Sequence, residues 1–243
     1  MNNKKSTVQE IVFGIHPLIE FLKAKKRPLY TIYTIQPTPK VWSQIAKLLP
    51  THAEVKYVSK QVLTKLAGTD DHQGVVAVTK PLPLRNRPFD PIKEPFILLL
   101  DGIQDTRNIG AIIRSAYCTG VSGIIIPAKR SAPLSGATYK ASAGLAEYMD
   151  IYQPETSYKA ALEAQKAGYD LYMAALGGKD ALDIDYEVPI CLVIGNEALG
   201  ISSEVLKLGQ KVMLPQRTAD ISYNASVAAG IMLFLIATKT KIL

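Results

Sequence analysis

The chain has 243 residues, 48% of them hydrophobic and 20% charged, with a formal net charge of +7. This is the composition of a globular protein, and the length allows one large domain or two modest domains. No apolar run reaches the ~18 residues of a membrane span, which excludes a membrane-spanning class. Residues 1–5 are polar with no apolar signal core behind them, so we expect a cytoplasmic protein.

The first part of the chain alternates between strand and helix patterns. Strands are predicted where β-branched and aromatic residues gather, at residues 30–35, 55–59 and 74–79. Helices are predicted at residues 15–25, 39–49 and 60–67. These elements predict a small α/β module over residues 1–80.

A proline-rich stretch follows this module. Four prolines fall within residues 80–91, and proline fixes φ and cannot donate to a β-ladder, so we predict an extended linker at residues 81–94. Residues 1–94 contain 15 Lys and Arg against 7 Asp and Glu, whereas residues 95–243 contain 13 against 14. A basic module beside a neutral one suggests a part that binds a polyanion, although a lysine-rich solubility surface would give the same balance.

After the linker, short apolar strands alternate with helices. Strands are predicted at residues 96–100, 123–127, 170–174, 190–194 and 211–214. Helices are predicted at residues 109–119, 133–148, 158–167, 202–208 and 224–237. This alternation predicts a second α/β domain over residues 95–243, with a parallel sheet covered by helices on both faces.

Three of these strands end in polar clusters, where sheets of this type bind ligands. The clusters are residues 101–108 leading to Arg114, residues 195–200, and residues 215–224. Any one of them has a purely structural explanation, but three clusters at three strand ends favour a site.

The structural explanations concern particular residues. Asn108 and Asn224 are good helix N-caps, and Ser222 could be a turn residue. Arg114 lies among small and apolar helix residues, where we expect it to be half-buried and to need an ionic partner. Gly195 lets the backbone approach a ligand closely, which is a weak signal by itself.

Several kinds of chemistry lack their motifs. No G-x-G-x-x-G follows a strand and no P-loop is present, so a nicotinamide-dinucleotide enzyme is disfavoured. His16, His52 and His72 all lie in the first module without metal-ligand spacing, and no metal site is predicted. Cys118 and Cys191 lie in apolar stretches and are expected to be reduced core thiols. The residue types that remain suit a group transfer in which a cofactor supplies the reactive centre.

The three clusters resemble the three motifs of one enzyme family. Residues 105–116 (DTRNIGAIIRSA) resemble the first motif of the SpoU (TrmH) family of RNA ribose 2′-O-methyltransferases. Residues 192–200 (LVIGNEALG) resemble the second motif. The third motif is matched from Leu214-Pro215 to residues 222–228 (SYNASVA).

Shorter matches point to the branch of this family that methylates guanosine in 23S rRNA. Residues 13–17 (FGIHP) and 72–77 (HQGVVA) are similar to the substrate-binding domain of that branch. Residues 100–102 and 129–132 match the same branch within the second domain.

The resemblance implies a fold that periodicity cannot reveal. It implies a SPOUT-type parallel sheet with a C-terminal trefoil knot, preceded by a small α/β substrate-binding domain like ribosomal protein L30e; knots are otherwise very rare. It also implies S-adenosylmethionine as methyl donor, RNA as substrate, and a homodimer that packs through the catalytic domains.

The resemblance also implies roles for particular residues. The cofactor-binding residues would be Gly195, Leu214 and Tyr223. The catalytic residues would be Asn108, Arg114, Glu197, Ser222 and Asn224. Because a guanidinium keeps its proton to above about pH 12, we favour a charged Arg114 that holds the phosphate and the developing alkoxide. The alternative is an Arg114 that is partly deprotonated by packing against other cations.

The chain departs from the family pattern at four positions. Thr106 stands where the family usually has proline, and Arg107 where it often has histidine or glycine. Tyr223 replaces the usual leucine, and Ala225 the usual valine. Since none of these is a catalytic position, we expect an active enzyme.

Two alternatives stay open beside the rRNA enzyme. One is a tRNA ribose methyltransferase of the same family, which the dedicated N-terminal domain disfavours. The other is a catalytically silent RNA-binding or ribosome-assembly protein, which the complete set of catalytic residue types disfavours.

Overall fold

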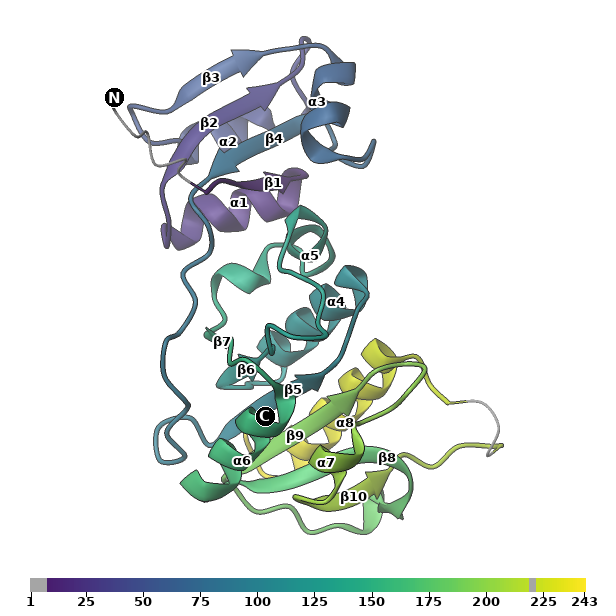
Figure 1. The fold of residues 1–243 in the computed structure, drawn as a ribbon. Helices are drawn as coiled ribbons and strands as arrows, with labels where there is room; N and C mark the ends of the chain where they lie inside the picture. Colours follow the sequence, from purple (N-terminus) through teal and green to yellow (C-terminus); the bar gives the residue numbers. More distant parts are fainter. Residues whose placement is uncertain (1–7, 219–221) are drawn as a thin grey trace, which may run out of the picture. The chain divides into compact units, whose positions relative to one another are not determined.

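The structure, a computed structural model, describes residues 8–218 and 222–243. The chain divides into two compact units (Figure 1). Unit 1 contains the chain up to Pro83 together with the segment from Leu134 to Tyr148. Unit 2 contains Leu84 to Pro133 and Met149 to Leu243. Residues 134–148, which lie inside the predicted second domain, therefore pack with the first unit.

Unit 1 is built on a four-stranded sheet in the order β1-β4-β2-β3. Strand β4 pairs antiparallel with β1 and β2, and β3 pairs parallel with β2. The sequence prediction missed β1, whose four residues lie ahead of the first predicted helix. The strands are β1 (Glu10–Phe13), β2 (Leu29–Thr34), β3 (Glu54–Tyr57) and β4 (Val75–Thr79), and the helices are α1 (Ile15–Ala24), α2 (Trp42–Leu48), α3 (Lys60–Ala67), α5 (Gly136–Ala141) and the short 3-10 turn η1 (Leu145–Glu147).

Local signals explain the helix ends in unit 1. The Ser59 side chain accepts a hydrogen bond from Val62 N at the start of α3, and Gly68 ends the helix with a left-handed φ of 70°. The predicted helix 133–148 is confirmed only in part, as α5, because left-handed φ values at Ala143 (53°) and Gly144 (87°) separate α5 from η1.

A buried charged cluster joins the 134–148 segment to the rest of unit 1. The Arg27 guanidinium is 6% exposed and donates to Glu147 (2.6 Å), Glu10 (2.5 Å) and the Lys80 carbonyl (2.9 Å). The fully buried Tyr139 hydroxyl also donates to Glu10, at 2.5 Å. Burial alone would lower the pKa of Arg27, but its hydrogen bonds to Glu147 and the neighbouring acidic groups raise it. The cluster is therefore a mutually satisfied structural network.

Unit 2 contains the predicted parallel sheet, with six strands in the order β10-β8-β9-β5-β6-β7. All five strand pairs are parallel. The strands are β5 (Phe96–Asp101), β6 (Gly123–Ile125), β7 (Ile151–Tyr152), β8 (Asp170–Asp180), β9 (Ile190–Gly195) and β10 (Gln210–Met213). The prediction missed the two-residue strand β7 and ended β8 too early.

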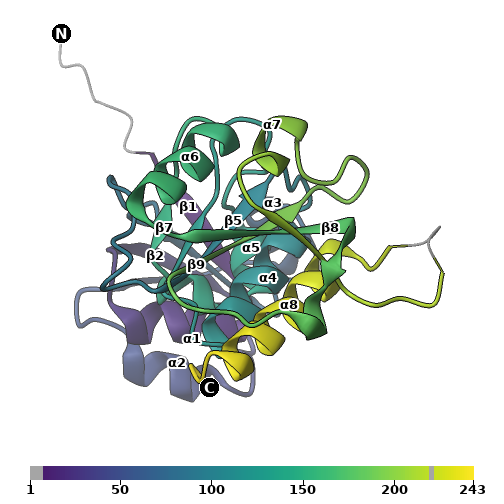
Figure 2. The same ribbon diagram turned by 90° about the horizontal axis from the view of Figure 1, so that it is seen from below.

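Helices cover both faces of this sheet, as predicted. Figure 2 shows α6 and α7 on one side of the sheet and α4 and α8 on the other. Helix α8 packs on α4, where a Cβ at Gly230 would make an ordinary contact, 3.5 Å from the Ser115 hydroxyl of α4. The helices are α4 (Thr106–Cys118), α6 (Ser157–Ala167), α7 (Ser203–Leu206) and α8 (Ala225–Lys239), with a 3-10 turn η2 (Ala181–Asp183) after β8.

The predicted linker 81–94 lies mostly within unit 2. Its residues from Leu84 onward belong to unit 2. Arg85 N donates to Ile151 O (2.8 Å) beside β7, and its guanidinium pairs with Glu94 (2.9 Å). Phe89 is buried so closely against Gly123 that a Cβ there would lie 2.1 Å from its ring. Most of this stretch is therefore packed against the second sheet.

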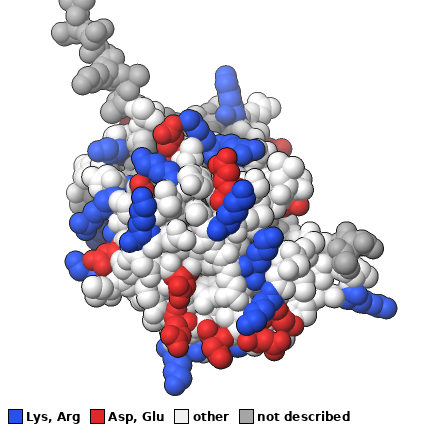
Figure 3. Space-filling model, turned by 60° about the horizontal axis from the view of Figure 1, so that its bottom comes forward, with Lys and Arg blue, Asp and Glu red and all other residues white. Residues whose placement is uncertain are grey.

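The formal charge divides unevenly between the units. Unit 1 contains 13 Lys and Arg and 6 Asp and Glu, whereas unit 2 contains 15 of each kind. The whole net charge of +7 thus belongs to unit 1. On the face that Figure 3 presents, side chains of both signs are interspersed.

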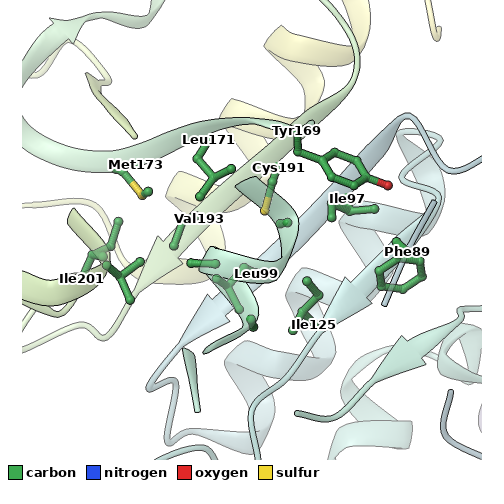
Figure 4. Close-up of a cluster of buried hydrophobic side chains, with 14 residues drawn as sticks. Phe89, Ile97, Leu99, Ile125, Tyr169, Leu171, Met173, Cys191, Val193 and Ile201 are labelled. Carbon is green, nitrogen blue, oxygen red and sulfur yellow. The ribbon is translucent and has the colours of Figure 1, made fainter. Parts of the chain in front are cut away.

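The core under α6 and α7 holds the second sheet and its helices together. Leu99 of β5, Met173 of β8 and Val193 of β9 are fully buried side by side (Figure 4). Cys191 belongs to this cluster, and burial raises the pKa of its thiol to about 12, so it is an inert core thiol as predicted. Cys118, by contrast, is exposed near the end of α4, so the prediction of a core position was wrong for it.

Candidate functional site

The site is built where β5 and β9 end beside each other. Asp101, the last residue of β5, lies opposite Gly195, the last residue of β9. Because all strands of this sheet are parallel, the loops after β5, β6, β9 and β10 leave from the same edge. The three predicted polar clusters thus share one edge of unit 2.

Hydrogen bonds tie the first two clusters together. Asp101 is 6% exposed, and its Oδ2 accepts from Ser202 N at 2.7 Å. Asn196 Nδ2 donates to Gly102 O (2.8 Å), and its Oδ1 accepts from Ala198 N (2.9 Å). The sequence analysis did not assign roles to Asp101 and Asn196. Their signal is the position of a carboxylate and an amide directly after buried strands.

Only glycine fits at position 195, because the backbone of Gly200 and Ile201 passes very close to it. A Cβ at this position would lie 2.3 Å from the Gly200 carbonyl carbon and 2.4 Å from Ile201 N. Asn196 and Gly200 exchange two backbone hydrogen bonds (3.1 and 2.8 Å), which close the loop. The backbone of this loop is therefore held in one shape without any ligand.

A cavity of about 420 Å³ lies beside this loop. Its lining brings together all three residues expected to bind the cofactor, Gly195, Leu214 and Tyr223. Glu197 and Ser222 from the expected catalytic set line it as well, whereas Asn108, Arg114 and Asn224 do not. The remaining wall is mostly apolar and comes from β8, β10 and α8, including Ala174, Ile194, Ile201, Val212, Ala228 and Met232.

Asn108 contacts Glu197 directly, so the first and second motifs meet at the edge of the cavity. Asn108 Nδ2 donates to Glu197 Oε1. The predicted N-cap role of Asn108 was wrong, because α4 begins earlier and Asp105 accepts from Arg107 N (2.7 Å) as its cap. With Asp105 in that role, the Asn108 side chain is available to Glu197.

Arg114 is exposed, which corrects the expectation that it would be half-buried with a partner. Within residues 8–218 and 222–243, its guanidinium makes no hydrogen bond or ion pair. An arginine that is not needed to neutralise a neighbouring carboxylate is available to an anionic ligand.

The third cluster lies at the start of α8. Asn224 caps this helix as predicted, its Oδ1 accepting from Ser226 N at 2.9 Å. The Tyr223 ring is 43% exposed and its hydroxyl donates to Pro215 O at 3.3 Å. Ser222 is exposed, while residues 219–221 of the same stretch lie outside the described residues.

The described residues show neither a metal-binding cluster nor a membrane-spanning helix. The described residues contain no group of three or more His, Cys, Asp or Glu side chains that could hold a metal ion. No helix in that part of the chain is long and apolar enough to cross a membrane. His72 in unit 1 is 2% exposed and accepts from Gly74 N through Nδ1 (3.0 Å), which is a structural role.

Comparison with known protein families agrees with the motifs. Residues 95–234 match the family model described as the SpoU rRNA Methylase family. Residues 11–85 match a second model, described as RNA 2'-O ribose methyltransferase substrate binding. The chain therefore belongs to the SpoU methylase family.

Individual relatives match over nearly the whole chain. A putative TrmH family tRNA/rRNA methyltransferase, YacO of Bacillus subtilis, is 30% identical over 96% of this chain and 97% of its own length. The 23S rRNA (guanosine-2'-O-)-methyltransferase RlmB of Shewanella oneidensis is 29% identical over 93% of this chain and 96% of its own. An rRNA methyltransferase of Sinorhizobium meliloti, solved with S-adenosylmethionine bound, is 26% identical with a TM-score of 0.78, covering 95% of this chain and 87% of its own.

Proposed function

We propose that the protein transfers a methyl group from S-adenosylmethionine to a ribose 2′-hydroxyl in RNA, on a guanosine of 23S rRNA. One observation supports this most strongly. A single cavity collects Gly195 from the end of β9 with Leu214 and Tyr223 from the segment between β10 and α8, and Glu197 at its rim accepts from Asn108. Family membership supplies the reaction class, and the RlmB relative of 29% identity supports the rRNA substrate.

The cavity suits the cofactor. S-adenosylmethionine is the cofactor of this chain, and its sulfonium supplies the methyl group when it is bound. A volume of about 420 Å³ lies within the range of small-molecule sites. The apolar wall suits an adenine ring, and the backbone hydrogen bonds between Asn196 and Gly200 close the loop that follows Gly195. The Tyr223 ring adds a surface for stacking.

The catalytic set is assigned as the family resemblance implies. We propose that Arg114 binds the phosphate and stabilises the alkoxide that develops on the ribose, because its charge is uncompensated within the described residues. Asn108, held by Glu197, orients the ribose or phosphate. We place Ser222 and Asn224 beside the reaction centre at the start of α8, where Ser222 lines the cavity and Asn224 caps the helix.

RNA binding is assigned to unit 1, which contains the predicted module of residues 1–80. This unit has the whole net charge of +7, while unit 2 is neutral. Neutralising phosphates with Lys and Arg releases counterions, so the affinity for RNA falls steeply as salt is added. We also assign to this unit the ribosomal protein L30e-like fold that the resemblance implies.

The remaining family features are also proposals. We propose that the segment ending in α8 forms the trefoil knot, since Ser222, Tyr223, Ala225 and Ala228 line the same cavity as residues 195–201. We propose a homodimer through unit 2, because α8 exposes Val227, Ile231 and Phe234 (49%, 42% and 61%) beside an apolar groove of about 640 Å³. Sedimentation should show a dimer that Phe234→Glu dissociates, and a monomeric wild type would remove this part of the proposal.

The proposal is tested by methyl transfer in vitro. The purified protein is incubated with labelled S-adenosylmethionine and an unmodified 23S rRNA transcript, and the RNA is digested to nucleosides. We expect label in 2′-O-methylguanosine. Arg114→Lys should abolish transfer while cofactor and RNA binding persist, because lysine cannot form the same fork of hydrogen bonds. Arg87→Lys, an exposed arginine of the same unit, is the matched control.

Three outcomes would change the proposal. Label only in a tRNA transcript would assign the protein to the tRNA branch. RNA binding without any transfer would favour the catalytically silent assembly protein. Near-full activity of Arg114→Lys would remove the bidentate role of Arg114.

A further inference from the structure

The loop after β6 lies against the candidate site. This loop, residues 128–132 (AKRSA), follows β6 at the same sheet edge as the three motif loops. Ala132 N donates to Ile103 O at 2.9 Å, which joins it to the loop after β5. A Cβ on Gly102 would lie 3.8 Å from Arg130 O and equally far from the Asn196 side chain. The loops after β5, β6 and β9 therefore meet around Gly102.

Arg130 adopts a backbone conformation that is unfavourable for its residue type. Its φ is 66°, in the left-handed region where glycine or asparagine is preferred. Its side chain is exposed and packs no core, so the strain brings no visible gain to the fold. Strain that the fold does not need is a reason to look for a ligand.

The two neighbouring cations of this loop, Lys129 and Arg130, differ in whether they have an ionic partner. Lys129 pairs with Glu155 at 2.6 Å, and its backbone N donates to Glu155 O at 3.1 Å. Arg130, by contrast, has no acidic or hydrogen-bonding partner in the described part of the chain. On the facing loops, Asp105 already caps α4 and Glu197 already accepts from Asn108. Arg130 therefore has no evident structural function for its charge.

Ser131 adds a second observation. Its Oγ is buried, and it is the one buried side-chain polar atom of the described residues that lacks a hydrogen-bond partner. Buried hydroxyls nearly always have a partner, so this one points to a group that binds at the loop.

We propose that the loop of residues 128–132 binds a phosphate of the substrate RNA next to the target ribose, with Arg130 as the positioning residue and Ser131 as a hydrogen-bond donor. This inference rests on the proposed function and extends it to a residue pair outside the three motifs. An anion at Arg130 could also be the carboxylate of the cofactor. We assign the RNA phosphate because Arg130 is absent from the lining of the cofactor cavity.

The test uses substitutions that change stability and RNA binding in opposite directions. Arg130→Gly removes the charge and relieves the left-handed strain, so the melting temperature should stay the same or rise. Affinity for an unmodified 23S rRNA transcript should fall about tenfold, and the slope of log K against log salt should shrink by about 1. Arg130→Lys should keep most of that slope, because the charge remains. Lys129→Gln, at the neighbouring paired cation, is the matched control and should change the RNA affinity less.

Ser131→Ala supplies an independent measurement. It should leave the melting temperature unchanged or raised, because the hydroxyl has no partner to lose, and should still weaken RNA binding. A lowered melting temperature with unchanged RNA binding would show that Ser131 is structural.

The outcomes separate this inference from the proposed function. Calorimetry with S-adenosylmethionine should give equal affinities for wild type and Arg130→Gly; a loss there would assign the loop to the cofactor and overturn the inference. Unchanged RNA affinity and salt slope in an active enzyme would overturn only the loop assignment. If the wild-type protein binds no cofactor, but the Arg130→Gly substitution still weakens RNA binding, the proposed function would be overturned and the loop assignment would be kept.

Discussion

Arg27 in unit 1 and two arginines of unit 2, Arg114 and Arg130, have opposite environments. In unit 1, Arg27 is 6% exposed and satisfied by Glu147, Glu10 and a backbone carbonyl. In unit 2, Arg114 and Arg130 are exposed and have no partner within the described residues. A buried charge must be paired to be tolerated, whereas an exposed charge at a strand end is free to meet a ligand. The comparison separates an arginine that maintains the fold from two arginines that we assign to the substrate.

The largest loss of stability should follow substitution of Arg27. Arg27→Met leaves Glu147 buried without its cation, and the free energy of unfolding should fall by about 3–5 kcal/mol. Urea unfolding measures this change. The control is Lys23→Met, which removes an exposed pair with Glu20 and should cost under about 1 kcal/mol. Equal losses of unfolding free energy in the two variants would contradict the distinction between buried and exposed ion pairs.

Gly195→Ala tests how tightly the loop beside the cavity is packed, for comparison with the Arg27 cluster of unit 1. The added Cβ would lie 2.3 Å from backbone carbon, so overpacking should cost about 1–3 kcal/mol of stability. Calorimetry should also show loss of S-adenosylmethionine binding. Gly230→Ala is a control for steric crowding, since its Cβ would make only an ordinary contact, 3.5 Å from the Ser115 hydroxyl. Cofactor binding unchanged in Gly195→Ala would remove Gly195 from the site.

Asn224→Ala tests a residue that has both a structural and a catalytic assignment. Loss of the cap on α8 should lower the unfolding free energy by about 1 kcal/mol. Asn224→Asp keeps a capping oxygen and should restore stability, but it should not restore methyl transfer, because a carboxylate cannot donate as the amide does. Full activity in Asn224→Asp would show that Asn224 is only a cap.

The smallest change in stability should come from Arg114. Arg114→Gln removes an exposed side chain without a partner, so the unfolding free energy should stay within about 0.5 kcal/mol of wild type. Methyl transfer should nevertheless be lost. A destabilisation as large as that of Arg27→Met would show that Arg114 is structural and would erase the comparison.

The sequence predicted the parallel sheet of unit 2 well, because its strands are continuous apolar runs. It missed β1, which leads almost directly into α1, and the two-residue β7, and it joined α5 and η1 into one helix. The break depends on Ala143, a good helix former that takes a left-handed φ here. Local propensity could not reveal this, since tertiary packing decides it.

The sequence named candidate site residues but could not predict their contacts. The motifs indicated Asn108 and Glu197 separately, and only the structure brings them together across 89 positions of the chain. The exposure of Arg114 could not be predicted from its apolar neighbours, because it depends on which helix face meets the sheet. The structural roles of Asp101 and Asn196 also required knowing that β5 and β9 are adjacent.

The central claim is that this chain methylates a ribose in rRNA. The most direct measurement maps ribose methylation across total RNA from cells with and without the gene. We predict that one 2′-O-methylated guanosine of 23S rRNA is lost without the gene and restored by the wild-type protein, but not by Arg114→Lys. An unchanged map in both RNA populations would contradict the claim, and a loss confined to tRNA would contradict its rRNA part.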